Sequence, residues 1–164
     1  MKISLKLASV LLCAPFGVQA QEATFTSQSL TPETALAAAQ AALAQCRKNG
    51  YQVAVAVVDK AGLPQVLLRD RYAGAHTVDV AVNKAWTAVS FKTPTLTLAE
   101  ETQPGKPMSG LRNHPRFLGA GGGRMIEGAG SLLGGIGVSG APGGDADDAC
   151  AQAGIRAIAE SLEF

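Results

Sequence analysis

The sequence predicts an α+β domain with a single antiparallel sheet flanked by helices. Its 164 residues are the size of one domain rather than two. Apolar residues make up 47% of the chain, which is enough to build a core and argues against a wholly disordered protein. The candidate strands come as neighbouring pairs joined by short turns, with helical patterns before, between and after them. Strands paired as hairpins form antiparallel sheets, and helices in this order complete an α+β domain.

The charge balance argues against one class of partner. Lys and Arg number 14 and Asp and Glu 13, so the formal charge is +1. Nucleic-acid-binding domains carry a strongly basic patch or stripe, which this composition does not indicate. We therefore expect no nucleic acid among the partners of the chain.

Residues 1–20 have the pattern of a secretory signal peptide. A positive start with Lys2 and Lys6 precedes an apolar run over residues 7–18, and small side chains precede a cleavage point after Ala20. A membrane anchor is the alternative, but a spanning helix needs about 20 apolar residues and this run is shorter. We expect cleavage near Ala20, a periplasmic or secreted location, and no stable membrane insertion.

A single domain is expected over residues 30–164, after a flexible polar leader over residues 21–29. The first helix begins just after Thr31, its N-cap, and ends near Lys48 ahead of an Asn-Gly pair. Its apolar positions recur every three to four residues and place Cys46 on the inward face.

A hairpin and a second helix come next. Residues 53–58 are a Val-rich run typical of a buried strand, residues 59–62 form a turn, and residues 64–70 are the returning strand. The second helix is expected over residues 78–90, with Thr77 as its N-cap.

The second half contains a further hairpin. A short helix is expected over residues 93–102, and residues 103–116, which hold three prolines, are expected to be mostly loop. A glycine turn over residues 119–123 then leads into a short strand over residues 124–126 and a longer one over residues 131–139.

The last helix, expected over residues 147–162, bears on the two cysteines that follow the signal peptide. Cys46 lies at the end of the first helix and Cys150 at the start of the last, so an antiparallel pair of these helices would bring them together. In an oxidising compartment such a pair is a candidate disulfide. Two buried free thiols are the alternative.

Glycine is the unusual component, because 14 of the 19 glycines lie between residues 105 and 144. The cluster over residues 119–123 is neither a Walker loop nor a dinucleotide fingerprint, because no Gly-Lys-Ser/Thr follows it and a strand rather than a helix comes next. Gly134, Gly135 and Gly137 would leave one strand face without side chains, which a flat ligand or another subunit could approach. A bulge and tight turns are the alternative.

The candidate chemistry centres on two histidines, and no catalytic constellation is evident. His76 lies directly before the second helix, which carries Lys84, and His114 lies close to Arg112. A histidine with cations nearby suits an anionic iron porphyrin, which needs an axial ligand and partners for its propionates. Each could instead be an ordinary surface histidine.

Four motifs resemble one known family. They are the run from Ala54 to Asp59 followed by Gly62, the segment Lys84-Ala85-Trp86-Thr87-Ala88, the turn Gly121-Gly122-Gly123, and the strand from Gly134 to Gly140. Together they resemble the GlcG/HbpS family over most of the chain after the leader.

The resemblance implies a sheet of five antiparallel strands flanked by helices in a profilin-like layout, assembled into compact homo-oligomers. Secreted relatives bind haem and are linked to haem sensing, storage or iron handling. Other relatives are cytosolic proteins of metabolic operons or are fused to cobalamin-related enzymes. One departure is that x-Pro-Ile commonly follows the glycine turn, where this chain has Arg124-Met125-Ile126.

These observations favour an exported haem-binding protein over a catalyst. His76 is the first-choice iron ligand and His114 the second, while Lys84 and Arg112 are the expected propionate partners. The glycines Gly121, Gly122 and Gly123 are expected to shape the edge of the pocket.

Two other functions stay open. The first is an enzyme or accessory protein that binds a small organic acid through Lys84, Arg112 and Arg124 in a catabolic pathway. The second is a structural oligomer whose glycines serve subunit packing.

Overall fold

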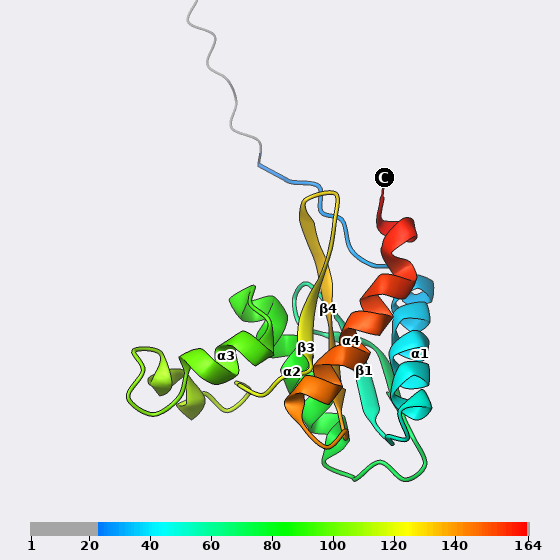
Figure 1. Ribbon diagram of the computed structural model, residues 1–164. Helices are drawn as coiled ribbons and strands as arrows, with labels where there is room; N and C mark the ends of the chain where they lie inside the picture. Colours follow the sequence, from blue (N-terminus) through cyan, green and yellow to red (C-terminus); the bar gives the residue numbers. More distant parts are fainter. Residues whose placement is uncertain (1–22, 164) are drawn as a thin grey trace, which may run out of the picture.

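A computed structural model describes residues 23–163, and the expected signal peptide lies outside them. Figure 1 shows the elements in chain order. They are α1 (Pro32–Lys48), β1 (Ala54–Asp59), β2 (Pro64–Arg69), α2 (Thr77–Phe91), α3 (Thr95–Glu101), the 3₁₀ helix η1 (Ser109–Asn113), β3 (Gly123–Gly128), β4 (Ser131–Ser139), α4 (Gly144–Ile158) and the 3₁₀ helix η2 (Ala159–Leu162). Within these residues no helix is long and apolar enough to cross a membrane.

The strands form one antiparallel sheet in the order β2-β1-β4-β3. This confirms the α+β class, but the expectation of five strands is wrong, because the described residues form a sheet of four. The stretch between α2 and β3 contains four prolines and folds into α3, η1 and turns, so it contributes no strand to the sheet.

Helices cover both faces of the sheet. Helices α1 and α4 lie side by side on one face and α2 lies on the other (Figure 1). The side chains of β1 alternate accordingly: Val55 and Val57 pack with α1 and α4, whereas Ala54 and Ala56 pack with α2. Small residues under α2 let that helix lie close to the sheet.

The bare face of β4 is covered by the chain's own helix. A Cβ at Gly135 would lie 2.6 Å from Cγ1 of Val89, and a Cβ at Gly137 would overlap the carbonyl oxygen of Ala81. Because Val89 and Ala81 belong to α2, the prediction that a ligand or another subunit approaches this face is wrong for Gly135 and Gly137. These glycines permit close packing of helix on sheet.

The start of α2 differs from the prediction. Thr77 is its first helical residue and not its N-cap, because the cap position falls on His76. The hydroxyl of Thr77 donates a 2.6 Å hydrogen bond to the carbonyl of Gly74. The preceding loop is thereby held against the helix, and His76 stands at the junction.

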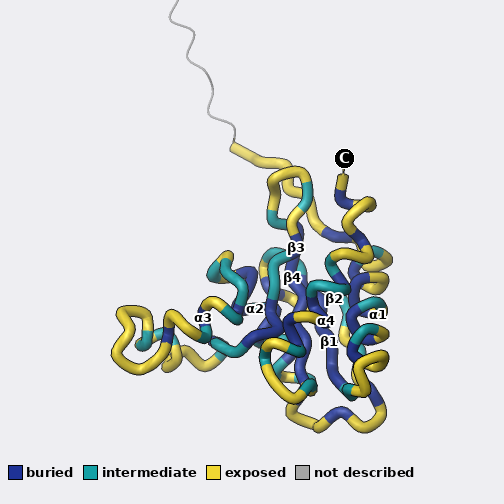
Figure 2. The backbone as a smooth tube through the Cα atoms, in the orientation of Figure 1, coloured by how far each residue is buried: buried dark blue, intermediate teal, exposed yellow. Residues whose placement is uncertain are grey.

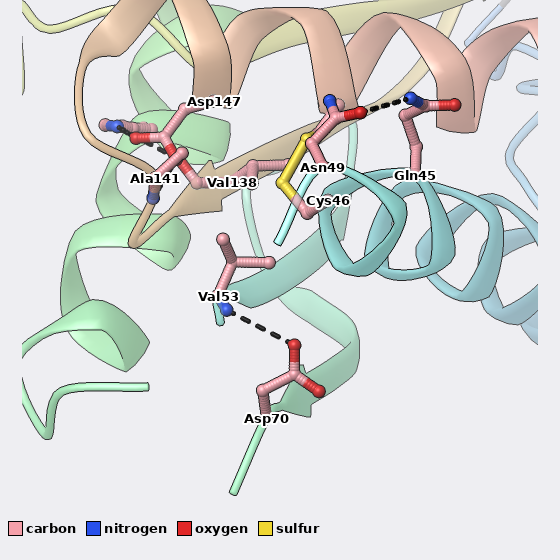
Figure 3. The surroundings of a disulfide bond; sticks show 10 residues. Gln45, Cys46, Asn49, Val53, Asp70, Val138, Ala141 and Asp147 are labelled. Atoms are coloured by element: carbon pink, nitrogen blue, oxygen red, sulfur yellow. Dashed lines mark hydrogen bonds and ion pairs between the residues drawn. A yellow bond between two sulfur atoms is a disulfide. The ribbon is translucent and has the colours of Figure 1, made fainter. Parts of the chain in front are cut away.

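A disulfide joins Cys46 to Cys150, with 5.6 Å between their Cα atoms. It ties the last turn of α1 to the second turn of α4 (Figure 3). The structure thus confirms the predicted pairing.

Near the start of β1, the carboxylate of Asp70 accepts a 3.3 Å hydrogen bond from the backbone N–H of Val53.

Helices α3 and η1 form an arm that projects to one side of the molecule (Figure 1). Figure 2 shows the central strands as largely buried and the far end of the arm as mostly exposed. The arm carries Arg112 and His114, so its position separates these two residues from the start of α2.

Candidate functional site

A cavity of about 500 Å³ lies where β4 ends and where α2 and α4 begin. Its volume is in the range of small-molecule sites in proteins. It is lined by Gly50, Tyr51, Gln52, Tyr72, Gly74, His76, Thr77, Lys84, Ala120, Ser139, Gly140, Ala141, Pro142, Gly143, Gly144 and Asp147. Two of the predicted site residues, His76 and Lys84, therefore meet in one cavity.

His76 offers an accessible imidazole at the wall of this cavity. The side chain is exposed and makes no hydrogen bond to the described part of the chain. Its ring lies over Gly74, where a Cβ would be only 2.7 Å from the ring Cε1 atom. The absence of a side chain at Gly74 therefore makes room for the imidazole. A neutral imidazole of this kind can ligate a metal through either nitrogen.

Lys84 forms a buried ion pair with Asp147. The two residues are only 3% and 4% exposed, and Lys84 Nζ lies 2.7 Å from Asp147 Oδ2. Lys84 also donates to the carbonyl of Val138 at 3.0 Å, and the backbone N–H of Ala141 donates to Asp147 Oδ1 at 2.9 Å. Figure 3 shows Asp147 beside Ala141 at the end of β4. The pair joins α2, β4 and α4 at the inner wall of the cavity.

Burial raises the pKa of Asp147 above its usual value, although the ammonium of Lys84 opposes this shift. The raised pKa reflects the cost of removing a carboxylate from water. Lys84 offsets part of that cost. Lys84 is thus an internal cation and not a flexible surface one.

His114 lies away from the cavity and its Nδ1 atom is engaged. Its ring stacks on Trp86, with 5.3 Å between the ring centroids and an interplanar angle of 9°. The backbone N–H of Arg116 donates to His114 Nδ1 at 3.2 Å. The Nδ1 atom of His114 is thus engaged, and the ring is not part of the cavity lining.

Arg112 and Arg124 are also engaged elsewhere. Arg112 donates to the carbonyls of Thr102 and Ala99 at 2.7 and 3.1 Å, which satisfies the C-terminal end of α3. Arg124 makes two parallel bonds, of 2.9 and 2.7 Å, to the carboxylate of Asp148 on α4. The structure brings neither arginine to the cavity.

The glycine turn lies directly behind the cavity wall. Gly121, Gly122 and Gly123 are not lining residues, although Ala120 is. A Cβ at Gly122 would lie 3.1 Å from Lys84 Nζ, and a Cβ at Gly121 would lie 2.7 Å from the carbonyl oxygen of Gly144. The turn therefore supports the ion pair and the start of α4 instead of forming the edge of the pocket.

Two cavity residues have roles that the sequence does not reveal. The sequence indicates Asp147 only as a negative charge at a helix start, because its partner lies 63 residues away and no local pattern links them. Ser139 enters only as one letter of a family motif. Within residues 23–163, no three His, Cys, Asp or Glu side chains gather as a metal-binding group. A haem iron needs only one protein side chain as a ligand, and the imidazole of His76 lines the cavity.

Comparison with known proteins identifies relatives of similar fold. The family described as haem degrading protein HbpS-like matches residues 30–156. The corrinoid adenosyltransferase PduO of Salmonella typhimurium is 36% identical over 121 residues, which cover 73% of this chain and 36% of that protein. The chain therefore spans about a third of the length of the PduO proteins it matches.

Solved structures agree over most of the chain. A double mutant of Streptomyces reticuli HbpS is 40% identical, with a TM-score of 0.76 and coverage of 87% of this chain and 97% of that one. A PduOC–haem complex is 33% identical, with a TM-score of 0.75 and coverage of 79% and 95%.

The matched span, residues 30–156, runs from just before α1 into the last turn of α4. It includes all four strands and the residues that line the cavity. The family resemblance expected from the four sequence motifs is thus confirmed, and the chain belongs to the HbpS-like family.

Proposed function

We propose that this protein binds haem in the cavity, with His76 as the axial ligand of the iron. The observation that carries the proposal is the accessible imidazole of His76 in the wall of the cavity, while the ring of His114 is engaged with Trp86 and Arg116. The similarity to a protein solved as a PduOC–haem complex supports haem as the ligand.

The lining of the cavity suits a large, flat and partly polar molecule. Tyr51 and Tyr72 supply aromatic rings, several glycines leave space, and His76 and Lys84 supply polar groups. Haem contributes an iron that takes an imidazole as its axial ligand. The protein's part is to hold the ring and to fix the imidazole.

Two of the three cations expected to bind a small organic acid are not available in the cavity. Arg112 binds the end of α3 and Arg124 binds Asp148, so only Lys84 is left to meet a carboxylate in the cavity. A small acid would also leave much of a cavity of about 500 Å³ unfilled. Haem is therefore the preferred ligand.

A haemin titration of the purified protein tests the proposal. We expect a stoichiometric shift of the Soret band, which His76→Ala should alter strongly and His114→Ala should leave nearly unchanged. The two variants are matched because each removes one imidazole from an exposed position. Absence of a stoichiometric shift in the wild-type protein would sink the proposal, and a larger effect of His114→Ala would reassign the ligand.

Export and assembly belong to the same proposal. The pattern of residues 1–20 supports secretion, so the mature protein recovered from the periplasm or medium should begin near Gln21 when its mass is measured. We further propose a homo-oligomer, for which light scattering should give a mass several times that of one chain. We include in the proposal a role of the exported, oligomeric protein in haem sensing, storage or iron handling.

A further inference from the structure

We infer that the inner end of the cavity is a subsite for one carboxylate group, formed by the Ser139 hydroxyl, the Lys84 ammonium and the first turn of α4. The inference rests on the proposed function to the extent that haem would supply the carboxylate as a propionate. The subsite itself is argued from the protein groups alone.

Ser139 is the first sign of a missing partner. The residue is 5% exposed, lines the cavity, and its hydroxyl has no hydrogen-bond partner in the part of the chain that the structure describes. The protein does not enclose this hydroxyl completely: among the described residues, the fully enclosed side-chain atom without a hydrogen-bond partner is Gln65 Oε1 and not Ser139 Oγ. The hydroxyl of Ser139 therefore still opens into the cavity. Buried polar groups are nearly always hydrogen-bonded. The partner of Ser139 is therefore expected to enter through the cavity.

The register of β4 explains why this hydroxyl points where it does. Val138 packs into the core between the sheet and the pair α1 and α4. Since neighbouring side chains of a strand point to opposite faces, Ser139 points toward the face that α2 covers. Lys84 lies on α2, and it donates to the carbonyl of Val138 next to Ser139.

Lys84 has a donor to spare. An ammonium group carries three N–H donors, and the structure accounts for two of them, to Val138 and to Asp147. Lys84 also lines the cavity. The third N–H and the Ser139 hydroxyl are therefore two side-chain donors at this end of the cavity.

The start of α4 adds backbone donors. Gly143 and Gly144 line the cavity, and no side chain caps this helix of 15 residues, whereas Thr31 caps α1. The first N–H groups of a helix lack partners within the helix and favour a negative charge. Together with the Ser139 hydroxyl and the third N–H of Lys84, they form a set of donors for which residues 23–163 supply no acceptor.

The charge of the subsite favours one negative charge over two. Both carboxylate oxygens of Asp147 are hydrogen-bonded, one to Lys84 and one to Ala141, so the ion pair is close to neutral. The helix end adds a partial positive charge, which is reduced by Asp145, an exposed acidic residue in the same first turn. A carboxylate matches this balance, and a phosphate dianion would bring an uncompensated charge beside Asp147.

The test compares haemin with its dimethyl ester, which keeps the ring and the iron but lacks both carboxylates. Wild-type protein should bind haemin about tenfold or more tightly than the ester, because hydrogen bonds to charged groups are the stronger ones. Ser139→Ala should reduce this preference to a few-fold and leave the affinity for the ester unchanged. Ser131→Ala, at the exposed opposite end of β4, is the matched control and should retain the full preference.

The outcomes separate the subsite from the haem proposal. Equal losses for haemin and the ester in Ser139→Ala, or no loss for either, would overturn the subsite even if haem binds. If wild-type protein binds no haemin, the haem proposal fails, and sodium propionate is used as the probe in an NMR titration of backbone amides. Shifts confined to Ser139, Gly143 and Gly144 would support the subsite, whereas no shift, or an equal response to inorganic phosphate, would overturn it.

Discussion

The ion pair between Lys84 and Asp147 connects the helices on opposite faces of the sheet. Each partner compensates for the desolvation of the other, and Val138 and Ala141 satisfy remaining hydrogen-bonding groups. The pair therefore fixes the inner wall of the cavity and ties the starts of α2 and α4 to the end of β4.

Removing both partners of this pair should cost less than the two single removals added together. Lys84→Met or Asp147→Asn should each lower the free energy of unfolding by about 3 to 5 kcal/mol, because a buried charge or polar group is left unpaired. The double variant, Lys84→Met with Asp147→Leu, should lose less than the sum of the two single losses, because no charge is then left buried without a partner. Urea unfolding measures all three, and single variants as stable as the wild type would contradict this role.

A side chain at Gly74 is expected to displace only the imidazole ring of His76. A Cβ at this position would meet only the imidazole ring, which can rotate away, so Gly74→Ala should cost little stability. The displaced ring should nevertheless weaken haemin binding and change the Soret spectrum. Gly110→Ala is the matched control, because nothing lies within 4 Å of a Cβ there. Unchanged haemin affinity in Gly74→Ala would show that the position of the ring is unimportant.

At the scale of elements, the close contact between α2 and β4 depends on small residues in both. Gly137→Ala would place its methyl group against the backbone of Ala81 and Ala85, which cannot move without shifting the helix. Overpacking of this kind costs about 1 to 3 kcal/mol. A thermal melt should therefore show a clearly lower Tm than for Gly110→Ala. Equal melting temperatures would mean that α2 adjusts freely on the sheet.

Most of the elements can be predicted from the sequence because their signals are local. Thr31 caps α1, accepting a 3.2 Å hydrogen bond from Thr34 N–H, and both hairpins lie where the strand runs and turns indicate. The predicted cap of α2 is wrong because Thr77 bonds back to Gly74, a contact set by the loop. The prediction for the glycine face of β4 is wrong because no local feature tells which element covers a strand.

At the scale of the whole molecule, the cavity depends on contacts between distant segments. His76 can be found from the sequence because the chain has only two histidines, and Lys84 because it lies on the helix that follows His76. The same reasoning assigns Arg112 and His114 to this site, but the arm carries them elsewhere. Ser139 and Asp147 acquire their roles only when the end of β4 meets the starts of α2 and α4.

The disulfide is the covalent link that holds this arrangement. Cys150 lies about one turn after Asp147, so its bond to Cys46 anchors the part of α4 that begins at the cavity to the end of α1. The bridged cysteines are 104 residues apart, and the chain-entropy account gives about 4 to 5 kcal/mol for a loop of this size. Loss of the bond should therefore affect both the stability and the cavity.

A double variant, Cys46→Ser with Cys150→Ser, should lower the free energy of unfolding by about that amount in urea. Haemin affinity should also fall, because the first turn of α4 is less firmly held against the end of α1. Adding a reductant should lower the stability and the haemin affinity of the wild-type protein toward those of the variant. The variant itself should not change on reduction, and it therefore serves as the control for effects of the reductant on haem. If the variant matches the oxidised wild type in both stability and affinity, noncovalent packing between α1 and α4 is sufficient. In that case the cavity would owe its shape to the core under the two helices and not to the bond between them.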